Sequence, residues 1–237
     1  MTRVESFIKL ADFPAARRWP AKHPERLQLY SLPTPNGVKV SIMLEEIGLA
    51  YESHRIDFVS KEQRAPEYLA LNPNGKIPAI IDPDGPGGAP LALYESCAIL
   101  LYLADKSSKF ISDDPALRYE TIQWLFWQAS AIGPMFGQLG YFHKFEGREI
   151  ADKRARDHFA EEVHKLLGVV DRRLSDRDWI MGNLFSVADV AVIGMVRNLI
   201  GFYDAAELVG FQDFDNVQRW LSAALVRPAV ARVLASP

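Results

Sequence analysis

Cysteine is nearly absent from this sequence, in which Cys97 is the only thiol among 237 residues. One thiol rules out a disulfide framework within a chain and suits a reducing compartment. We expect Cys97 to be a buried structural thiol, with a peroxide-sensing role as the alternative. The five histidines are scattered, and none lies at metal-ligand spacing from a cysteine or another histidine. We therefore predict no metal site and a cytoplasmic location.

Long apolar runs and a large net charge are missing as well. The longest apolar stretches, such as Ala98–Ala104, are much shorter than a membrane span, and the first twenty residues lack the pattern of a secretory signal. The net charge of −3 gives no overall attraction to nucleic acid or to an anionic membrane surface. The sequence also has no P-loop, G-x-G-x-x-G or G-x-S-x-G motif. A soluble protein without nucleic-acid or membrane partners is the expectation.

Two different patterns fill the rest of the chain, after residues 1–26, which show no periodicity and are expected to form an irregular extension. Residues 27–106 alternate in the order βαβ, short α, ββα, and residues 115–237 have helical spacing throughout. Gly133, Pro134 and Gly137 predict a kink and positions of close approach. The helices predicted in the second domain are Ala116–Tyr141, Ile150–Leu174, Val187–Gly201 and Asn216–Val226.

The turn between the first strand and the first helix reads Thr34-Pro35-Asn36-Gly37. A helix that begins near Asn36 points unpaired backbone N–H groups and the positive end of its dipole at this turn. A thiolate would be stabilised there, because Thr34 and Asn36 can both donate hydrogen bonds to sulfur. In the alternative interpretation Asn36 merely caps the helix and Gly37 eases the bend.

Two further motifs also have alternative interpretations. A cis Ile77-Pro78 bond would turn the backbone groups of Ile77 outward to pair with an extended peptide, whereas a trans proline would be an ordinary strand start. Ser96 begins an apolar helix and can bind a carboxylate there, while Glu95 can accept from an ammonium group. A simple cap beside a solvated acid is the alternative. Together the three motifs would hold an amino-acid head, a peptide middle and a thiol end, which describes glutathione.

With these motifs in place, the chain resembles the glutathione transferases from about Leu27 to Arg232, and within them the bacterial Nu-class, YghU/YfcG-type branch. The stretch Ser186–Val190 resembles the capping box that the family carries in its helical domain, with Ser186 as the cap and Asp189 returning to the backbone. The resemblance implies the glutathione transferase fold, with an α/β thioredoxin-like N-terminal domain and an all-α C-terminal domain.

For function, the resemblance implies a glutathione-dependent thiol-disulfide oxidoreductase that binds two reduced or one oxidised glutathione per site. Glutathione would be the co-substrate, and the protein would be a homodimer. Thr34 and Asn36 would be the catalytic residues. The residues implied to bind glutathione are Gln63, Lys76, Ile77, Pro78, Glu95 and Ser96. A cation from the partner subunit is implied near Arg156 and His158, with His158 at the position where the family usually has arginine.

Two other functions stay open at this point. A transferase that conjugates an aromatic electrophile, or cleaves a thioether, would need a suitable second pocket, whose size the sequence does not give. Phe136, Tyr141 and Phe142 are candidates for its wall, with an ordinary core role as the alternative. A non-catalytic glutathione-binding regulator is also compatible with this fold.

Overall fold

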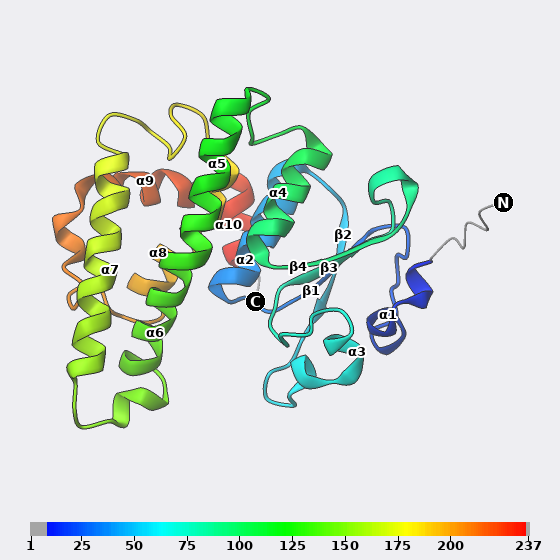
Figure 1. The fold of residues 1–237 in the computed structure, drawn as a ribbon, viewed down its shortest axis with the longest axis horizontal. Coiled ribbons are helices and arrows are strands. Elements are labelled where there is room, and N and C mark those ends of the chain that lie inside the picture. Colours follow the sequence, from blue (N-terminus) through cyan, green and yellow to red (C-terminus); the bar gives the residue numbers. More distant parts are fainter. Residues whose placement is uncertain (1–8, 236–237) are drawn as a thin grey trace. The chain divides into compact units, whose positions relative to one another are not determined.

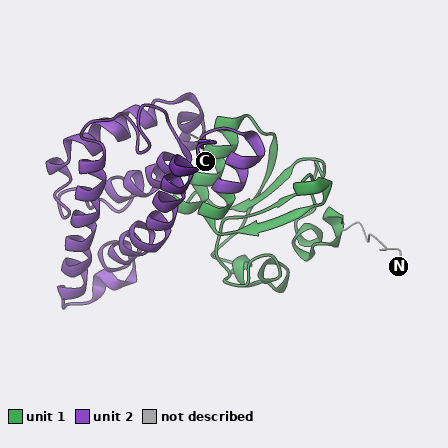
Figure 2. Ribbon diagram, turned by 45° about the horizontal axis from the view of Figure 1, so that its top comes forward, with its two compact units in different colours: residues 1–99 green, residues 100–237 purple. Residues whose placement is uncertain are grey.

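The computed structural model describes residues 9–235, and the chain divides into two compact units, residues 1–99 and 100–237 (Figure 2). The division falls within helix α4, Ser96–Ser107. The order of elements in the first unit is βαβαββα after the N-terminal extension, as the sequence predicts. The second unit is helical. The α/β and all-α character of the two regions is thus confirmed.

A four-stranded mixed sheet organises the first unit, in the order β2-β1-β3-β4 (Figure 1). β1 pairs parallel with β2 and antiparallel with β3, and β4 pairs antiparallel with β3. β1 is central and wholly buried, and β2 is an edge strand with one buried residue, His54. The strands are β1 Leu27–Ser31, β2 Tyr51–Arg55, β3 Ala79–Asp82 and β4 Leu91–Tyr94, and the helices between them are α2 Pro35–Ile47 and α3 Pro66–Leu69.

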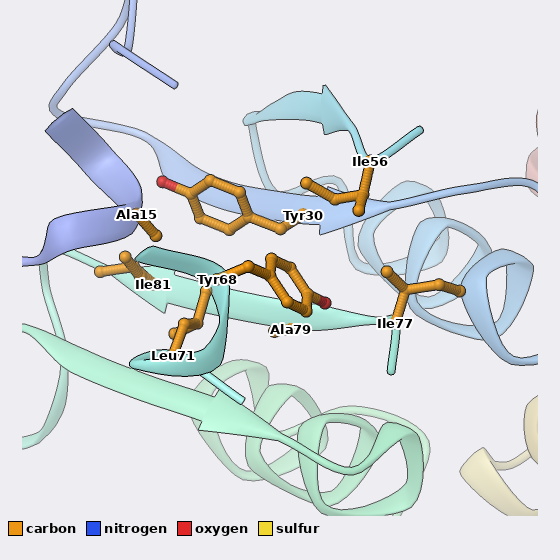
Figure 3. Close-up of a cluster of buried hydrophobic side chains, with 8 residues drawn as sticks. All are labelled: Ala15, Tyr30, Ile56, Tyr68, Leu71, Ile77, Ala79 and Ile81. Atoms are coloured by element: carbon orange, nitrogen blue, oxygen red, sulfur yellow. The ribbon is translucent and has the colours of Figure 1, made fainter. Parts of the chain in front are cut away.

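The described part of the extension is more ordered than predicted. It contains a short 3-10 turn, Leu10–Asp12, and the helix α1, Pro14–Arg18. Ala15 of α1 joins a buried cluster on one face of the sheet (Figure 3). The ring of Trp19 meets Tyr30 and Tyr68 edge-on at 6.0 and 6.2 Å. The sequence missed α1 because a five-residue helix shows no periodicity of its own; its order comes from packing on the sheet.

The helical unit departs from the predicted ranges at two prolines and at the helix expected from Ile150, which begins at Arg154. The helix expected over 116–141 is interrupted by a π-helical turn, Gln128–Ile132, which ends two residues before Pro134, where the sequence predicts a kink. Close approach at Gly137 is wrong, because no atom lies within 4 Å of a Cβ built there. The sequence missed α10, which begins at Pro228. The helices are α5 Pro115–Trp127, α6 Gly133–His143, α7 Arg154–Arg173, α8 Val187–Ile200, α9 Asp215–Leu225 and α10 Pro228–Ala235.

Asp189 organises the centre of this unit from the first turn of the buried helix α8. Its fully buried carboxylate accepts hydrogen bonds, each of 2.9 Å, from the backbone N–H groups of Ile180 and Ser186, the Ser186 hydroxyl and Trp220 Nε1. The predicted return of Asp189 to the backbone of Ser186 is confirmed. Burial raises the pKa of the Asp189 carboxyl, and the four donors act in the opposite direction.

Candidate functional site

The turn that leads into α2 is capped by Thr34. Its Oγ1 accepts a 3.2 Å hydrogen bond from the backbone N–H of Gly37, and α2 begins at Pro35. Asn36 is therefore the second residue of the helix, and the interpretation of Asn36 as the cap is wrong. Because the Thr34 hydroxyl acts as an acceptor in this cap, its own proton can be donated to another acceptor. The backbone N–H of Asn36 is one of the four at a helix start that have no intrahelical partner.

Gly37 brings the start of α2 directly against the end of β1. A Cβ at this position would lie 2.0 Å from the carbonyl oxygen of Leu32 and 2.6 Å from Ser31 Oγ. The nearer atom belongs to the backbone and cannot rotate away, so a larger residue would displace the helix start. Glycine is therefore required here for close approach, which sets the position of Thr34 and Asn36 relative to the sheet.

Lys39 joins two of the predicted motifs, although it belongs to neither of them. Its side chain is fully buried, and its Nζ donates to Asn36 Oδ1 at 2.8 Å and to Ser96 Oγ at 3.4 Å. The Ser96 hydroxyl is also 3.5 Å from Asn36 Oδ1. The start of α2 and the start of α4 thus meet around one ammonium group. The signal in the sequence was the spacing of three residues from Asn36, which places Lys39 on the same helix face.

Burial also shifts the pKa values of this ammonium group and of the neighbouring Cys97 thiol. It lowers the pKa of Lys39 to about 8, against the opposing influence of Cys97 and Glu95. Burial raises the pKa of the Cys97 thiol, although nearby Lys39 acts in the other direction. Cys97 is half-buried rather than fully buried, so the prediction of a buried thiol holds only in part. A thiol with a raised pKa is a poor nucleophile, which agrees with a structural role for Cys97.

Glu95 has an unusual backbone conformation at the start of α4. Its φ is 70°, in the left-handed region that residues other than glycine seldom adopt. Its side chain is exposed, and Ser96, the first residue of the helix, is half-buried. Such residues persist where the surroundings hold them, often at ligand sites. The conformation therefore supports a binding role for the Glu95-Ser96 pair.

The Ile77-Pro78 peptide bond is cis. This is the first of the two alternatives that the sequence leaves open for this proline. Ladder pairing of β3 begins at Ala79, so Ile77 lies just before the paired residues. The carbonyl oxygen of the preceding residue, Lys76, accepts hydrogen bonds from Tyr68 Oη at 2.8 Å and Asn72 Nδ2 at 2.6 Å. These two side chains hold the segment that leads into the proline.

Gln63 lies beside the same segment, in the short turn Glu62–Arg64. Gly75 has a φ of +61°, and a Cβ there would lie 2.9 Å from the carbonyl oxygen of Gln63. Gln63 Oε1 is buried, and no described residue gives it a hydrogen-bond partner. Buried amide oxygens are nearly always paired, so this atom is suited to accept from a ligand.

The aromatic candidates in the helical unit differ in exposure. Phe136 is 2% exposed and fits the ordinary-core alternative, whereas Tyr141 is 43% exposed. The Tyr141 ring lies edge-on to Phe142 at 5.0 Å, and Phe142 stacks on Phe159 at 5.7 Å. These contacts fix the two rings side by side on α6, so both can form part of a wall.

Arg156 and His158 lie in the first turns of α7. The Arg156 guanidinium donates to Asp157 Oδ1 through Nε at 2.8 Å and Nη2 at 2.6 Å, and the His158 ring is 5.4 Å from Phe159. Within residues 9–235 no group of three or more histidine, cysteine or acidic side chains could hold a metal ion. In the same range, no helix combines the length and apolar character needed to cross a bilayer.

Comparisons with known proteins point in one direction. The model of the glutathione S-transferase N-terminal domain matches residues 25–105, and that of the C-terminal domain matches residues 133–228. The disulfide-bond oxidoreductase YghU of Escherichia coli is 39% identical over 219 residues, which are 89% of this chain and 74% of that protein.

Two similar crystal structures contain ligands. The glutathione transferase of Pseudomonas putida, with one glutathione disulfide bound per subunit, is 58% identical with a TM-score of 0.94 and covers 97% of this chain and 100% of that one. The glutathione transferase of Burkholderia graminis, with two glutathione molecules bound per subunit, is 60% identical with a TM-score of 0.95. The match covers 99% of this chain and 98% of that one.

Proposed function

The chain belongs to the glutathione S-transferase family, and we propose that it is a glutathione-dependent disulfide-bond oxidoreductase that binds two reduced or one oxidised glutathione per site. The observation that carries the proposal is the pair of similar structures, one with glutathione disulfide and one with two glutathione molecules per subunit. A further support is the absence of cysteine from the Thr34–Gly37 turn, because the reactive sulfur must then come from the ligand.

In the proposed reaction two bound thiols supply the electrons. The thiolate of one glutathione attacks a sulfur of the disulfide substrate, forms a mixed disulfide and releases the first substrate thiolate. The thiolate of the second glutathione attacks the glutathionyl sulfur, and glutathione disulfide forms while the second substrate thiolate leaves. Both released thiolates take up the protons that the glutathione thiols lost. One disulfide is reduced and two thiols are oxidised, so atoms and electrons balance.

The start of α2 favours the attacking thiolate. We assign this role to the Thr34 hydroxyl, whose proton can be donated, and to the backbone N–H and carboxamide of Asn36. A decrease of about 2 units in the thiol pKa requires about 2.7 kcal/mol. A helix N-terminus together with charge-assisted hydrogen bonds supplies an energy of this size.

The remaining glutathione contacts follow the same assignment. Glu95 would accept from the ammonium group of the amino-acid head, and Ser96 would bind its carboxylate at the start of α4. Ile77, next to Pro78, would pair with the peptide backbone of glutathione. Gln63 supports this assignment with its buried Oε1, and Lys76 would add a charge from the exposed side of the segment.

We also propose a cytoplasmic homodimer of the Nu class, organised as an extension (1–26), a glutathione-binding domain (27–106) and a helical domain (115–237). Support for the dimer comes from α5, where Tyr119 and Phe126 are 72% and 71% exposed and lie seven residues apart on one helix face. Arg156 or His158 would contact the partner's glutathione, and Tyr141 with Phe142 would form part of the second-substrate pocket.

The direct test is glutathione-dependent reduction of 2-hydroxyethyl disulfide by the purified protein. We expect turnover, and we expect Asn36→Ala to lose at least about tenfold of the rate because one donor to the thiolate is removed. The exposed Asn183→Ala serves as the matched control and should keep full activity. Normal activity in Asn36→Ala would contradict the assigned sulfur contact.

The same preparation distinguishes the other functions. Conjugation of chlorodinitrobenzene much faster than disulfide reduction would identify a conjugating transferase. Glutathione binding in calorimetry without turnover in either assay would identify a non-catalytic binding protein. No uptake of reduced or oxidised glutathione by the folded protein would overturn all three functions together.

A further inference from the structure

We propose that Lys39 is a positioning residue, which locks the Asn36 carboxamide so that its NH2 group faces the glutathione sulfur. The inference rests on the proposed function and deepens it, because it names the residue that orients the sulfur contact. Lys39 acts through Asn36 and makes no contact with the reacting atoms in this proposal.

The donor and acceptor inventory fixes the orientation. A lysine ammonium group can only donate, so the atom that it meets at 2.8 Å on Asn36 must be the carbonyl oxygen. The two polar atoms of a carboxamide lie on opposite sides of its terminal carbon. With Oδ1 held toward the interior by Lys39 and Ser96, Nδ2 points away from both. A donor group is thus the part of Asn36 that remains for a ligand.

Asn36 needs such a lock because its side chain is exposed. The terminal torsion of asparagine is broad and nearly two-fold, so an unrestrained amide at the surface samples both orientations. In the flipped orientation the carbonyl oxygen would face the thiolate, and two electron-rich atoms would repel each other. The same flip would place Nδ2 against the Lys39 ammonium group, donor against donor. Lys39 therefore disfavours the unproductive orientation from the buried side.

Burial of Lys39 argues that its role is not to stabilise the fold. A fully buried ammonium group loses its hydration, and the Asn36 and Ser96 side chains to which it donates are neutral. Its pKa of about 8 still leaves it mostly protonated at neutral pH, so it keeps its capacity to donate. An apolar side chain of similar length would fill the same space without a desolvation penalty. A residue that opposes stability in this way is expected at functional sites.

The test compares Lys39→Met, which keeps the length and removes the donor, with Lys39→Gln, which keeps a donor without the charge. The thiolate absorbance of bound glutathione, titrated against pH, reports the thiol pKa. We expect Lys39→Met to raise this pKa by about one unit and to lower kcat/KM about tenfold at pH values below it, with convergence above it. Lys39→Gln should show a smaller rise in the thiol pKa and a smaller fall in kcat/KM. The exposed Lys22→Met should match the wild type in both quantities.

Repeating the test in a protein that carries Asn36→Ala separates positioning through Asn36 from other effects of Lys39. If Lys39 acts through Asn36, then Lys39→Met should change the thiol pKa little in a protein that already carries Asn36→Ala. Equal effects in both backgrounds would overturn the proposal, and so would a wild-type thiol pKa in folded Lys39→Met. Should Lys39→Met not fold, Lys39→Gln with and without Asn36→Ala decides in the same way.

The outcomes also separate this inference from the proposed function. A wild-type protein that reduces no disulfide, but whose bound thiol titrates higher in Lys39→Met, loses the proposed function and keeps the role of Lys39. A wild-type protein that turns over normally, with unchanged thiol pKa and pH profile in Lys39→Met, keeps the function and loses the inference.

Discussion

The two units each bury a charged side chain completely, and the two side chains differ in the partners that surround them. Asp189 in the helical unit accepts four hydrogen bonds of 2.9 Å, two from backbone N–H groups and two from side chains. Lys39 in the sheet unit donates to Asn36, which is exposed, and to Ser96, which is half-buried. The carboxylate joins segments of one core, whereas the ammonium group supports side chains at a surface. We therefore expect the first charge to serve stability and the second to serve the proposed site.

Replacement of Asp189 should have the largest effect on stability. Asp189→Ala leaves four buried donors without an acceptor, and loss of a buried, fully paired charge typically costs about 3–5 kcal/mol. We expect the free energy of unfolding in urea to fall by this amount, if the variant folds at all. Asp113→Asn, on the exposed linker, is the control and should change the value little. A mild effect for Asp189→Ala would remove the contrast between the two charges.

Lys39→Met should not lower stability as Asp189→Ala does. Burial lowers the pKa of Lys39 from 10.5 to about 8, which corresponds to a penalty of about 3 kcal/mol on the charged form. We therefore expect Lys39→Met to be as stable as the wild type at pH 7, or more stable by up to this amount, while its activity falls.

The pH dependence provides a check on this expectation. Between about pH 8 and 10.5 the unfolded wild-type chain binds more protons at residue 39 than the folded chain does. The stability of the wild type should therefore rise relative to Lys39→Met across that range, as urea unfolding at pH 7 and pH 10 would measure. A large loss of stability in Lys39→Met at pH 7 would make Lys39 a structural residue like Asp189.

Two glycines, Gly37 in the first unit and Gly137 in the second, extend the comparison to the backbone. A methyl group at Gly37 would clash with the carbonyl oxygen of Leu32, so we expect a loss of about 1–3 kcal/mol together with weaker glutathione binding in calorimetry. Gly137→Ala is the matched control, because its Cβ would meet no atom within 4 Å on a helix. It should stabilise the protein by about 0.5–1 kcal/mol. Equal effects at the two glycines would contradict the close approach at the turn.

The sequence predicts the sheet unit well because its signals are local. Alternating apolar residues define β1 and β2, and Thr34-Pro35-Asn36-Gly37, Ile77-Pro78 and Glu95-Ser96 are short motifs at element ends. Their spatial relation could not be read in the same way. That Ser96 meets Asn36 depends on how α4 packs beside α2, which is a contact over sixty residues of sequence.

Lys39 escaped prediction for a related reason. A single lysine within a helix is normally taken as solvent-exposed, because charged side chains are seldom buried. Its burial is decided by the tertiary packing around α2 and not by the residues next to it in the sequence. The helix α10 was missed because Pro228 interrupts the periodic pattern, although proline is common at the first position of a helix.

The smallest effect on stability is expected at His54, a buried titratable group. Its Nε2 lies 2.7 Å from Gln28 Oε1, at hydrogen-bonding distance. Its ring stacks on Tyr30 at 4.7 Å. Burial lowers the pKa of His54 although Glu52 opposes the shift, so the folded state prefers the neutral ring. As the pH falls below about 6.5, the unfolded chain takes up a proton that the folded chain resists, and stability should decrease.

His54→Gln removes this titration and should flatten the decrease between pH 7.5 and pH 5 in urea unfolding, whereas His23→Gln, at an exposed position, should leave it unchanged. An unaltered slope in His54→Gln would mean that other groups cause the acid sensitivity. His54 would then differ from Lys39, whose pKa burial lowers to about 8, because burial of the His54 ring would not measurably disfavour its charged form.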